Sequence, residues 1–409
     1  MADKIVLAYS GGLDTSACVV WLKDKFGYDV VAMAADVGQA GEFGSIQDRA
    51  SYAGAIEAQV VDCKEEFARD YLVPALRANA LYEGKYPLVS ALSRPVIVKH
   101  MVDTARKVGA VAVAHGCTGK GNDQVRFEVS TGALAPDLDI VAPVRSWNMT
   151  REQCIEYLSD KGITFEVTKK SPYSIDDNLW GRAIECGILE DPWLTPPDDV
   201  YELTKITATN PSEITISFEE GIPVALDGQA MGLVELIEKL GAHVGSYGFG
   251  RLDMVENRRV GIKSREVYEC PASLALIYAH QDLEAITLER DLHHEKMNLE
   301  HRYSELIYDG LWFSPLRESL DSFMESASKR VTGDVRLRCD TPGKSIDGSR
   351  SPGKVYVAGR RSPYSLYSHE LATYGDADTF RHQDSEGFVK IWGLGLKTWA
   401  QQAGEEPNR

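Results

Sequence analysis

Short apolar runs alternate with amphipathic segments along the first 165 residues, and few folds accommodate that pattern. The apolar runs predict strands at 5–9, 29–35, 58–62, 111–115 and 140–142. Helical spacing predicts helices near 13–26, 43–57, 64–80 and 95–108. Strands and helices that alternate in this way form right-handed crossovers and a mostly parallel sheet. We therefore expect an α/β domain whose ligand lies beyond the carboxyl ends of its strands.

A Ser-Gly-Gly turn at residues 10–12 separates the first predicted strand from the first predicted helix. Its glycines permit positive φ and let a ligand approach the backbone. The N-terminus of the following helix presents unpaired N–H groups and a partial positive charge, which suit phosphate or pyrophosphate. A plain turn capped by Ser10 is the alternative. Neither G-x-x-x-x-G-K-[ST] nor G-x-G-x-x-G follows the strand, so the turn is not a Walker A loop and a dinucleotide site is disfavoured.

A second polar loop, His-Gly-Cys-Thr-Gly-Lys-Gly-Asn-Asp-Gln-Val-Arg at 115–126, follows the fourth predicted strand. A parallel sheet would place this loop beside the first one. Thr118, Asn122, Asp123 and Arg126 offer both donors and acceptors, and three glycines allow close approach of a ligand. A solvated loop without a ligand is the alternative.

Arg94 precedes Pro95 and permits two interpretations. The pair is typical of a turn that leads into a helix with Pro95 at its first position. Arg94 is equally suited to hold a carboxylate with both arms of its guanidinium.

The pattern changes after residue 165. The segment 169–197 is rich in Pro, Asp and Trp and predicts a linker or a site loop. Beyond it, we predict a β-hairpin at 212–226, helices at 229–240, 271–308 and 314–330, strands at 335–337 and 355–358, and a short amphipathic helix at 394–403. We expect three parts: a nucleotide-binding domain over 1–165, an α+β domain over 166–361 and a tail over 362–409. The tail has too few apolar residues for a core of its own, so we expect it to dock on another subunit.

Composition excludes several classes of protein. The net charge of −17 on 409 residues argues against nucleic acid as the main partner. No apolar run reaches the ~18 residues of a membrane span, and we expect no signal peptide before the first strand. Seven scattered cysteines without C-x-x-C spacing predict reduced thiols in a cytoplasmic protein, with neither a zinc site nor a disulfide frame.

Two motifs together, Ala-Tyr-Ser-Gly-Gly-Leu-Asp-Thr-Ser at 8–16 and the polar loop at 115–126, resemble the argininosuccinate synthase family. The first motif alone resembles the wider N-type ATP pyrophosphatases, whereas the second is narrower. Further matches lie at 86–95, 174–180, 250–257, 261–265 and 368–374, so that the resemblance covers nearly the whole chain.

The resemblance implies a ligase that joins citrulline to aspartate, a step of arginine biosynthesis, and releases AMP and pyrophosphate from ATP. The ureido oxygen of citrulline would attack the α-phosphate to form a citrullyl-adenylate, and the aspartate amine would then displace AMP. No covalent catalysis by the protein is needed, and positioning is expected from Asp14, Asn122 and Arg126. Mg²⁺ would accompany ATP without a fixed protein site, and a cytoplasmic homotetramer without nucleic-acid or membrane partners is implied.

The resemblance also assigns residues to each substrate. For ATP, it implies Ala8, Tyr9, Ser10, Gly11, Gly12, Leu13, Asp14, Thr15, Ser16, Ala35 and Gly116. For citrulline, it implies Tyr86, Ser90, Asn122, Arg126, Ser174, Glu256 and Tyr268. For aspartate, it implies Thr118, Asn122 and Asp123, with the Asp123 carboxylate receiving the α-ammonium group.

Two positions depart from the pattern of the family. Ala91 and Ala183 stand where some members carry serine near citrulline. Neighbours such as Ser90 could offset the lost hydroxyls, or the amino-acid substrate could differ. Because Glu256 and Tyr268 lie far from the first loop in sequence, we expect the second domain to fold over the first and form a cleft.

Three alternatives stay open at this point. A different adenylating ligase would use another ureido or amide acceptor, and would show pyrophosphate exchange that does not depend on citrulline. A tRNA-modifying pyrophosphatase would be expected to carry a basic face and paired cysteines. A nucleotide-sensing module would bind ATP without releasing pyrophosphate.

Overall fold

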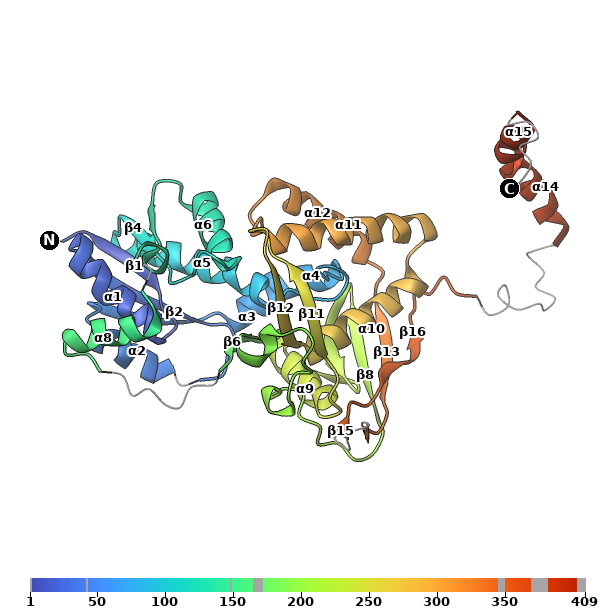
Figure 1. Cartoon of the computed structure of the whole chain (residues 1–409). Coiled ribbons are helices and arrows are strands. Elements are labelled where there is room, and N and C mark those ends of the chain that lie inside the picture. Colours follow the sequence, from blue (N-terminus) through green and yellow to red (C-terminus); the bar gives the residue numbers. More distant parts are fainter. Residues whose placement is uncertain are drawn as a thin grey trace. The chain divides into compact units, whose positions relative to one another are not determined.

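A parallel sheet with strand order β3-β2-β1-β4-β5 forms the centre of the N-terminal half (Figure 1). Its strands are β1 Lys4–Ala8, β2 Asp29–Asp36, β3 Glu57–Asp62, β4 Ala112–Ala114 and β5 Asp139–Val141. All four neighbouring pairs run parallel, as the alternating pattern predicts. The computed structural model describes residues 2–41, 43–147, 149–164, 172–344, 350–368 and 382–402.

Helices alternate with these strands. They are α1 Leu13–Phe26, α2 Phe43–Tyr52, α3 Lys64–Glu66, the π-helix η1 Phe67–Leu72, α4 Val73–Arg77, α5 Val89–Val108, α6 Asp123–Leu134, α7 Pro143–Trp147 and α8 Arg151–Asp160. The predicted helix over 43–57 is too long, since α2 ends at Tyr52 and β3 begins at Glu57. The predicted helix over 64–80 is interrupted by η1 and ends at Arg77.

The start of α5 corrects the interpretation of Pro95 as a first helical residue. The helix begins at Val89, and Pro95 lies inside it. Two side chains from the second half of the chain hold the segment before it: Asn178 Nδ2 donates to the Val89 carbonyl at 2.8 Å, and Trp180 Nε1 donates to the Pro87 carbonyl at 2.8 Å. A residue before proline disfavours the helical conformation, which alone would place the helix start later. These tertiary contacts therefore support the earlier start at Val89.

Two antiparallel sheets follow in the second half of the chain, in the orders β10-β9-β8-β13-β16 and β11-β12-β7-β6, with a short β14-β15 pair. Their strands are β6 Ser174–Asn178, β7 Gly181–Glu185, β8 Ser212–Glu219, β9 Ile222–Leu226, β10 Gln229–Ala230, β11 Arg251–Asn257, β12 Lys263–Glu269, β13 Gly333–Cys339, β14 Gly343–Lys344, β15 Arg350–Ser351 and β16 Val355–Arg361. The helical elements are η2 Gly187–Glu190, η3 Asp198–Val200, α9 Leu233–Gly245, α10 Pro271–Thr287, α11 Arg290–Tyr308 and α12 Pro315–Ser328.

The predicted hairpin over 212–226 is confirmed by β8 and β9, and the predicted strands near 335 and 355 pair as β13 and β16. The long helix predicted over 271–308 is two helices, because Glu289 caps α11 by accepting from the N–H groups of Asp291 and Leu292. The segment 169–197, predicted as a linker or a site loop, contributes the β6–β7 hairpin. The β11–β12 hairpin has no counterpart among the predicted elements.

One hydrophobic core cluster spans the two halves. It contains Phe67 and Leu92 from the first half together with Phe218, Leu240 and Leu276 from the second. A buried polar cluster also crosses this junction, where Lys296 Nζ lies 2.9 Å from Glu284 Oε1 and Asn79 Nδ2 donates to Glu284 Oε2 at 2.6 Å. The core and this cluster fix the second half against α4 and α5.

The C-terminal unit, Ser365–Arg409, is separate from the unit Met1–Tyr364. Its described helices are α14 His382–Trp392 and α15 Leu394–Gln402. The second matches the predicted helix near 394–403, while the first was not predicted. Both leave large apolar side chains exposed, including Phe388, Trp392 and Leu396. The motif at 368–374 lies outside the described residues after position 368, and docking of the tail on another subunit stays a prediction.

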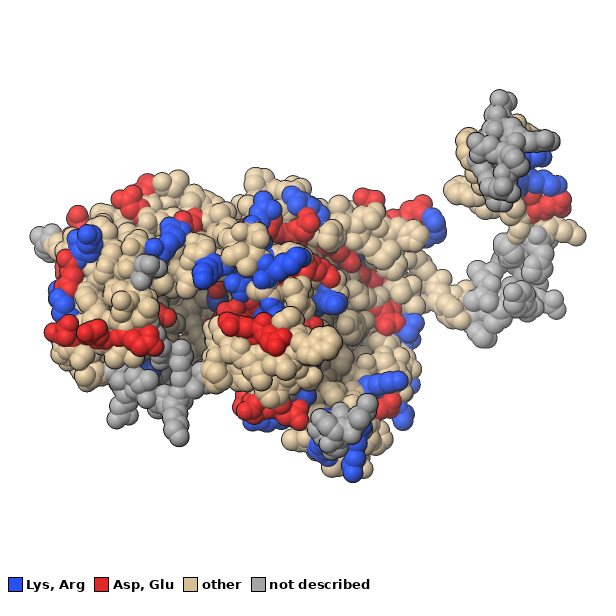
Figure 2. Space-filling view, viewed as in Figure 1, with Lys and Arg blue, Asp and Glu red and all other residues tan. Residues whose placement is uncertain are grey.

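Charged side chains of both signs share the surface. On the face shown in Figure 2, Lys and Arg side chains lie among Asp and Glu side chains. Within the described ranges, no helix is long and apolar enough to cross a membrane. The seven cysteines, all of them described, are not joined by disulfides.

Candidate functional site

Two adjoining cavities lie at the carboxyl edge of the parallel sheet. The first, here called the sheet-edge cavity, has a volume of about 400 Å³ and is lined by residues at the ends of β1, β2 and β4. The second, the interdomain cavity, has a volume of about 410 Å³ and is lined by both halves of the chain. The two cavities share the lining residues Ser10, Arg94, Gly116, Cys117, Asp123, Ile175 and Asp176. The two cavities therefore adjoin along these residues.

The predicted ATP residues divide into two groups. Those that line the sheet-edge cavity are Ala8, Tyr9, Ser10, Thr15, Ala35 and Gly116. Those that do not line it are Gly11, Gly12, Leu13, Asp14 and Ser16. Ser16 is fully buried and binds the Tyr9 hydroxyl at 2.8 Å, so it supports the loop from behind.

The Ser-Gly-Gly turn leaves the start of α1 open. Gly12 is the N-cap residue, and no side chain caps the helix. Ser10 Oγ instead accepts from the Gly12 N–H at 3.4 Å and lies 3.1 Å from Thr15 Oγ1. Gly11 has φ +75°, and a Cβ there would lie 3.0 Å from Ile46 Cγ1, so the turn requires glycine. This geometry disfavours the plain capped turn and leaves the first N–H groups of α1 to bind an anion.

The second polar loop lies against the first, as the sheet order predicts, but its last residues, Asp123–Arg126, form the first turn of α6. A Cβ on Gly116 would lie 3.0 Å from Thr15 Cγ2. The absence of a side chain at Gly116 allows this close approach, which brings the 115–126 segment next to the start of α1.

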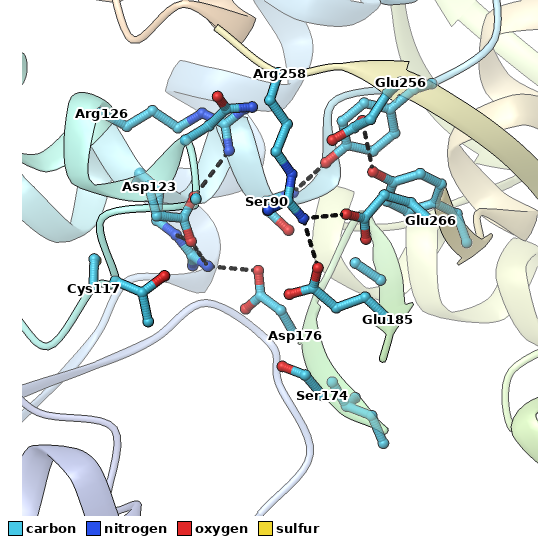
Figure 3. A pocket seen from close by; sticks show the side chains of 18 of the residues that line it. Ser90, Cys117, Asp123, Arg126, Ser174, Asp176, Glu185, Glu256, Arg258 and Glu266 are labelled. Atoms are coloured by element: carbon cyan, nitrogen blue, oxygen red, sulfur yellow. Dashed lines mark hydrogen bonds and ion pairs between the residues drawn. The ribbon is translucent and has the colours of Figure 1, made fainter. Parts of the chain in front are cut away.

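A row of alternating charges runs along the shared wall of the cavities. Arg94 Nη2 donates to Asp176 Oδ2 at 2.6 Å and to Asp123 Oδ2 at 2.8 Å, and Arg126 Nη1 donates to Asp123 Oδ1 at 2.9 Å (Figure 3). Burial alone raises the pKa of Asp123, but the guanidinium groups of Arg94 and Arg126 outweigh it and lower the pKa to about 2. Arg94 thus holds carboxylates of the protein, and its Nε and Nη2 both reach one oxygen of Asp123.

All predicted citrulline and aspartate residues line the interdomain cavity. From the first half these are Tyr86, Ser90, Thr118, Asn122, Asp123 and Arg126; from the second half they are Ser174, Glu256 and Tyr268. The expected cleft between the two halves is therefore present. Ala183 also lines this cavity, whereas Ala91 is buried in α5 beside Ser90.

An aromatic pair brings the two halves together at this cavity. The rings of Tyr86 and Tyr268 stack with centroids 4.2 Å apart. The Tyr268 hydroxyl donates to Glu256 Oε2 at 3.0 Å, and the Ser90 N–H donates to the Tyr86 hydroxyl at 2.9 Å. Leu88, between them in sequence, has φ +66°, an uncommon conformation for a buried leucine that the flanking contacts must hold.

Glu256 and Arg126 offer opposite charges to a ligand. Burial raises the pKa of Glu256, while the charge of Arg126 and the Tyr268 hydroxyl oppose that rise. Arg126 is also buried, with Nε donating to the Tyr308 carbonyl at 3.1 Å and its guanidinium 5.0 Å from the Tyr308 ring. A carboxylate acceptor and a fixed guanidinium in one cavity suit an α-amino acid, which carries both charges.

The second-half wall contains charged residues that the sequence analysis did not single out. They are Asp176 and Glu185 on β6 and β7, Glu266 on β12 and Arg258 directly after β11. For Arg258 and Glu266, the signal was the charged spacing in 250–266, which becomes informative only once β11 and β12 are recognised as strands. Among the described residues, no group of three or more His, Cys, Asp or Glu side chains is placed to hold a metal ion.

Comparison with known proteins gives a consistent match over the chain. Residues 4–164 match the family model described as Arginosuccinate synthase N-terminal HUP domain, and residues 173–399 match Arginosuccinate synthase C-terminal domain. A relative named argininosuccinate synthase from Dictyoglomus turgidum is 51% identical over 403 residues, covering 98% of this chain and 99% of the relative. The proteins of that name from Gloeobacter violaceus and Synechococcus sp. are 52% and 53% identical over 404 residues, covering 98% of this chain and 99% and 98% of the relatives.

Proposed function

Since the chain belongs to the argininosuccinate synthase family, we propose that its sheet-edge cavity binds ATP and its interdomain cavity binds citrulline and aspartate. The chain is a carbon–nitrogen ligase that joins the two amino acids at the expense of ATP, a step of arginine biosynthesis. The observation that carries the assignment of cavities is their shared wall, which includes Ser10, Gly116 and Asp123. A nucleotide phosphate in the sheet-edge cavity would lie next to the reacting end of an amino acid in the interdomain cavity.

The chemistry follows from this contact. A ureido oxygen is a poor leaving group. When that oxygen attacks the α-phosphate of ATP, the oxygen becomes part of an AMP ester, and AMP is a better leaving group. The amine of aspartate then attacks the ureido carbon, and AMP leaves. The open N-terminus of α1 and the hydroxyls of Ser10 and Thr15 support a site for the pyrophosphate that departs in the first step.

Residue roles follow from charge. Arg126 would hold the citrulline carboxylate and Glu256 would accept from its N–H groups, with the Tyr86–Tyr268 stack closing the cavity. Thr118, Asn122 and Asp123 would bind aspartate, its ammonium group at the Asp123 carboxylate. Asp14 is exposed and lines neither cavity, so a positioning role for it finds less support than for Asn122 and Arg126.

No protein nucleophile is required. Cys117 lies in both cavities, but burial raises the pKa of its thiol and disfavours the reactive thiolate. Rate acceleration would instead come from holding three reactants in line, which is worth up to ~7–11 kcal/mol in favourable cases.

Four further features belong to this proposal. Mg²⁺ would enter with ATP, since this ion is bound mainly by substrate phosphates, water and a few protein oxygens such as those of Ser10 and Thr15. Residues 1–165 would form the ATP domain, 166–361 the synthetase domain and 362–409 a multimerisation tail. The exposed apolar side chains of α14 and α15 support a homotetramer assembled through that tail. Seven cysteines without disulfides are consistent with a cytoplasmic enzyme.

Exchange of labelled pyrophosphate into ATP tests the proposal. With Mg²⁺ and citrulline, but without aspartate, the protein should catalyse the exchange; addition of aspartate should yield AMP and pyrophosphate in equal amounts. Formation of ADP and orthophosphate, or exchange that ignores citrulline, would contradict it.

A further inference from the structure

The tip of the β11–β12 hairpin, residues 258–262, connects the two walls of the interdomain cavity. Arg258 Nη2 lies between two carboxylates of the second half and donates to Glu185 Oε2 and Glu266 Oε1, each at 2.6 Å (Figure 3). Its other terminal nitrogen, Nη1, donates to the Lys120 carbonyl at 3.3 Å. One guanidinium thus joins the second-half wall to the polar loop of the first half.

The neighbouring residue fixes the orientation of Asn122. The backbone N–H of Arg259 donates to Asn122 Oδ1 at 2.9 Å. A backbone N–H can only donate, so the acceptor must be the amide oxygen and Asn122 retains its NH₂ group for other partners. Asn122 is buried and lines the interdomain cavity, where that NH₂ group suits a carboxylate oxygen of a ligand.

The guanidinium of Arg258 is held by two carboxylates in a mostly buried position. Its side chain is 15% exposed, and that of Glu266 is 7% exposed. Removal of the guanidinium would leave the Glu266 carboxylate in the wall without its cation. A lysine at this position retains the charge but lacks the planar fork that reaches both carboxylates and a carbonyl at once.

We infer that Arg258 is a positioning residue for the second substrate: it fastens the 118–123 loop in the geometry that receives aspartate. This inference rests on the proposed function, because it assumes that Thr118, Asn122 and Asp123 bind aspartate. Arg258 acts through Lys120 and the adjoining Arg259 and lies away from the anion site. In the described part of the chain, the lining of the sheet-edge cavity includes Asp123 but not Arg258. The adenylation step should therefore depend on Arg258 far less than the capture of aspartate.

The substitution Arg258→Lys separates these two steps. We expect the KM for aspartate to rise about tenfold, the factor for loss of one hydrogen bond of ~1.4 kcal/mol. Citrulline-dependent pyrophosphate exchange, measured without aspartate, should change by a much smaller factor, since Arg258 lines the interdomain cavity but not the sheet-edge cavity. Thermal unfolding of the variant should stay near that of the unmodified protein, since lysine still neutralises the carboxylates.

Arg265→Lys is the matched control. Arg265 lies on the same hairpin, binds the Asp253 carboxylate at 2.6 Å and donates to the Asp191 carbonyl at 2.6 Å, but it lines neither cavity. This variant should leave the KM for aspartate unchanged. Should Arg258→Lys fail to fold, Glu185→Gln loosens Arg258 from its more exposed partner and should raise the KM for aspartate by a smaller factor.

Each result has one meaning. An unchanged KM for aspartate in a folded Arg258→Lys variant overturns the inference, and so does an equal loss of exchange and ligation, which would indicate a general structural role. If the unmodified protein itself shows no citrulline-dependent exchange, the proposed function fails first and the inference with it.

Discussion

Replacing Tyr268 by phenylalanine removes one hydroxyl and leaves the aromatic stack with Tyr86 in place. That hydroxyl donates to Glu256 Oε2 at 3.0 Å in a buried part of the interdomain cavity. A hydrogen bond to a charged group contributes about 1.5–3 kcal/mol, which corresponds to a factor of about 10–150 in binding. We expect the KM for citrulline in pyrophosphate exchange to rise by this factor, while the KM for ATP stays unchanged.

The pH dependence of this variant gives a second readout. Burial raises the pKa of Glu256, and the Tyr268 hydroxyl opposes that rise together with Arg126. Without the hydroxyl, Glu256 takes up a proton at a higher pH and loses the charge that accepts from citrulline. The rise in KM for Tyr268→Phe should therefore grow as the pH falls.

Tyr82→Phe is the control for Tyr268→Phe. The Tyr82 hydroxyl donates to the Asn257 carbonyl at 2.7 Å, beside the same hairpin, and Tyr82 does not line the interdomain cavity. It should leave the KM for citrulline unchanged. If Tyr268→Phe behaves like this control, or raises the KM values for ATP and citrulline equally, then the Tyr268 hydroxyl does not support the binding of citrulline by Glu256.

Three other predictions concern separate features. Gly11→Ala forces a Cβ into positive φ at a cost of about 1–2 kcal/mol, so thermal unfolding should shift down by a few degrees and the KM for ATP should rise; unchanged values would contradict the requirement for glycine. Asp123→Asn should destabilise the protein above pH 3.8, the ordinary pKa of the group, and this difference should fade as the pH falls toward 2, because the folded-state pKa of Asp123 is the lower one; an unfolding free-energy difference that does not change with pH would refute this. Lys296→Met leaves the buried Glu284 without its cation and should lower the free energy of unfolding by about 3–5 kcal/mol in denaturant titration, whereas no loss would show that the cluster needs no cation.

Local sequence predicts the strands of the parallel sheet in the first half of the molecule, although several helix boundaries there differ. The strands β1 and β4 are continuous apolar runs, and each is followed by a loop rich in glycine and polar residues. Because parallel strands end at one edge of a sheet, strand order alone brought the Ser10 and Gly116 loops together. The strand–helix alternation predicts the fold class of this half, and the resemblance that the two motifs carry agrees with the family models.

The second wall of the site depended on tertiary structure. Glu256 and Arg258 stand on a hairpin whose strands carry charged residues on both faces, a pattern that local periodicity does not identify as β-structure. Helix α5 begins at Val89, where Asn178 and Trp180 bind the backbone around it. The residue before Pro95 would by itself prefer an extended conformation, which favours a later helix start. Contacts between residues about 90 positions apart, such as these, are set by packing of one half on the other, and no short-range pattern encodes them.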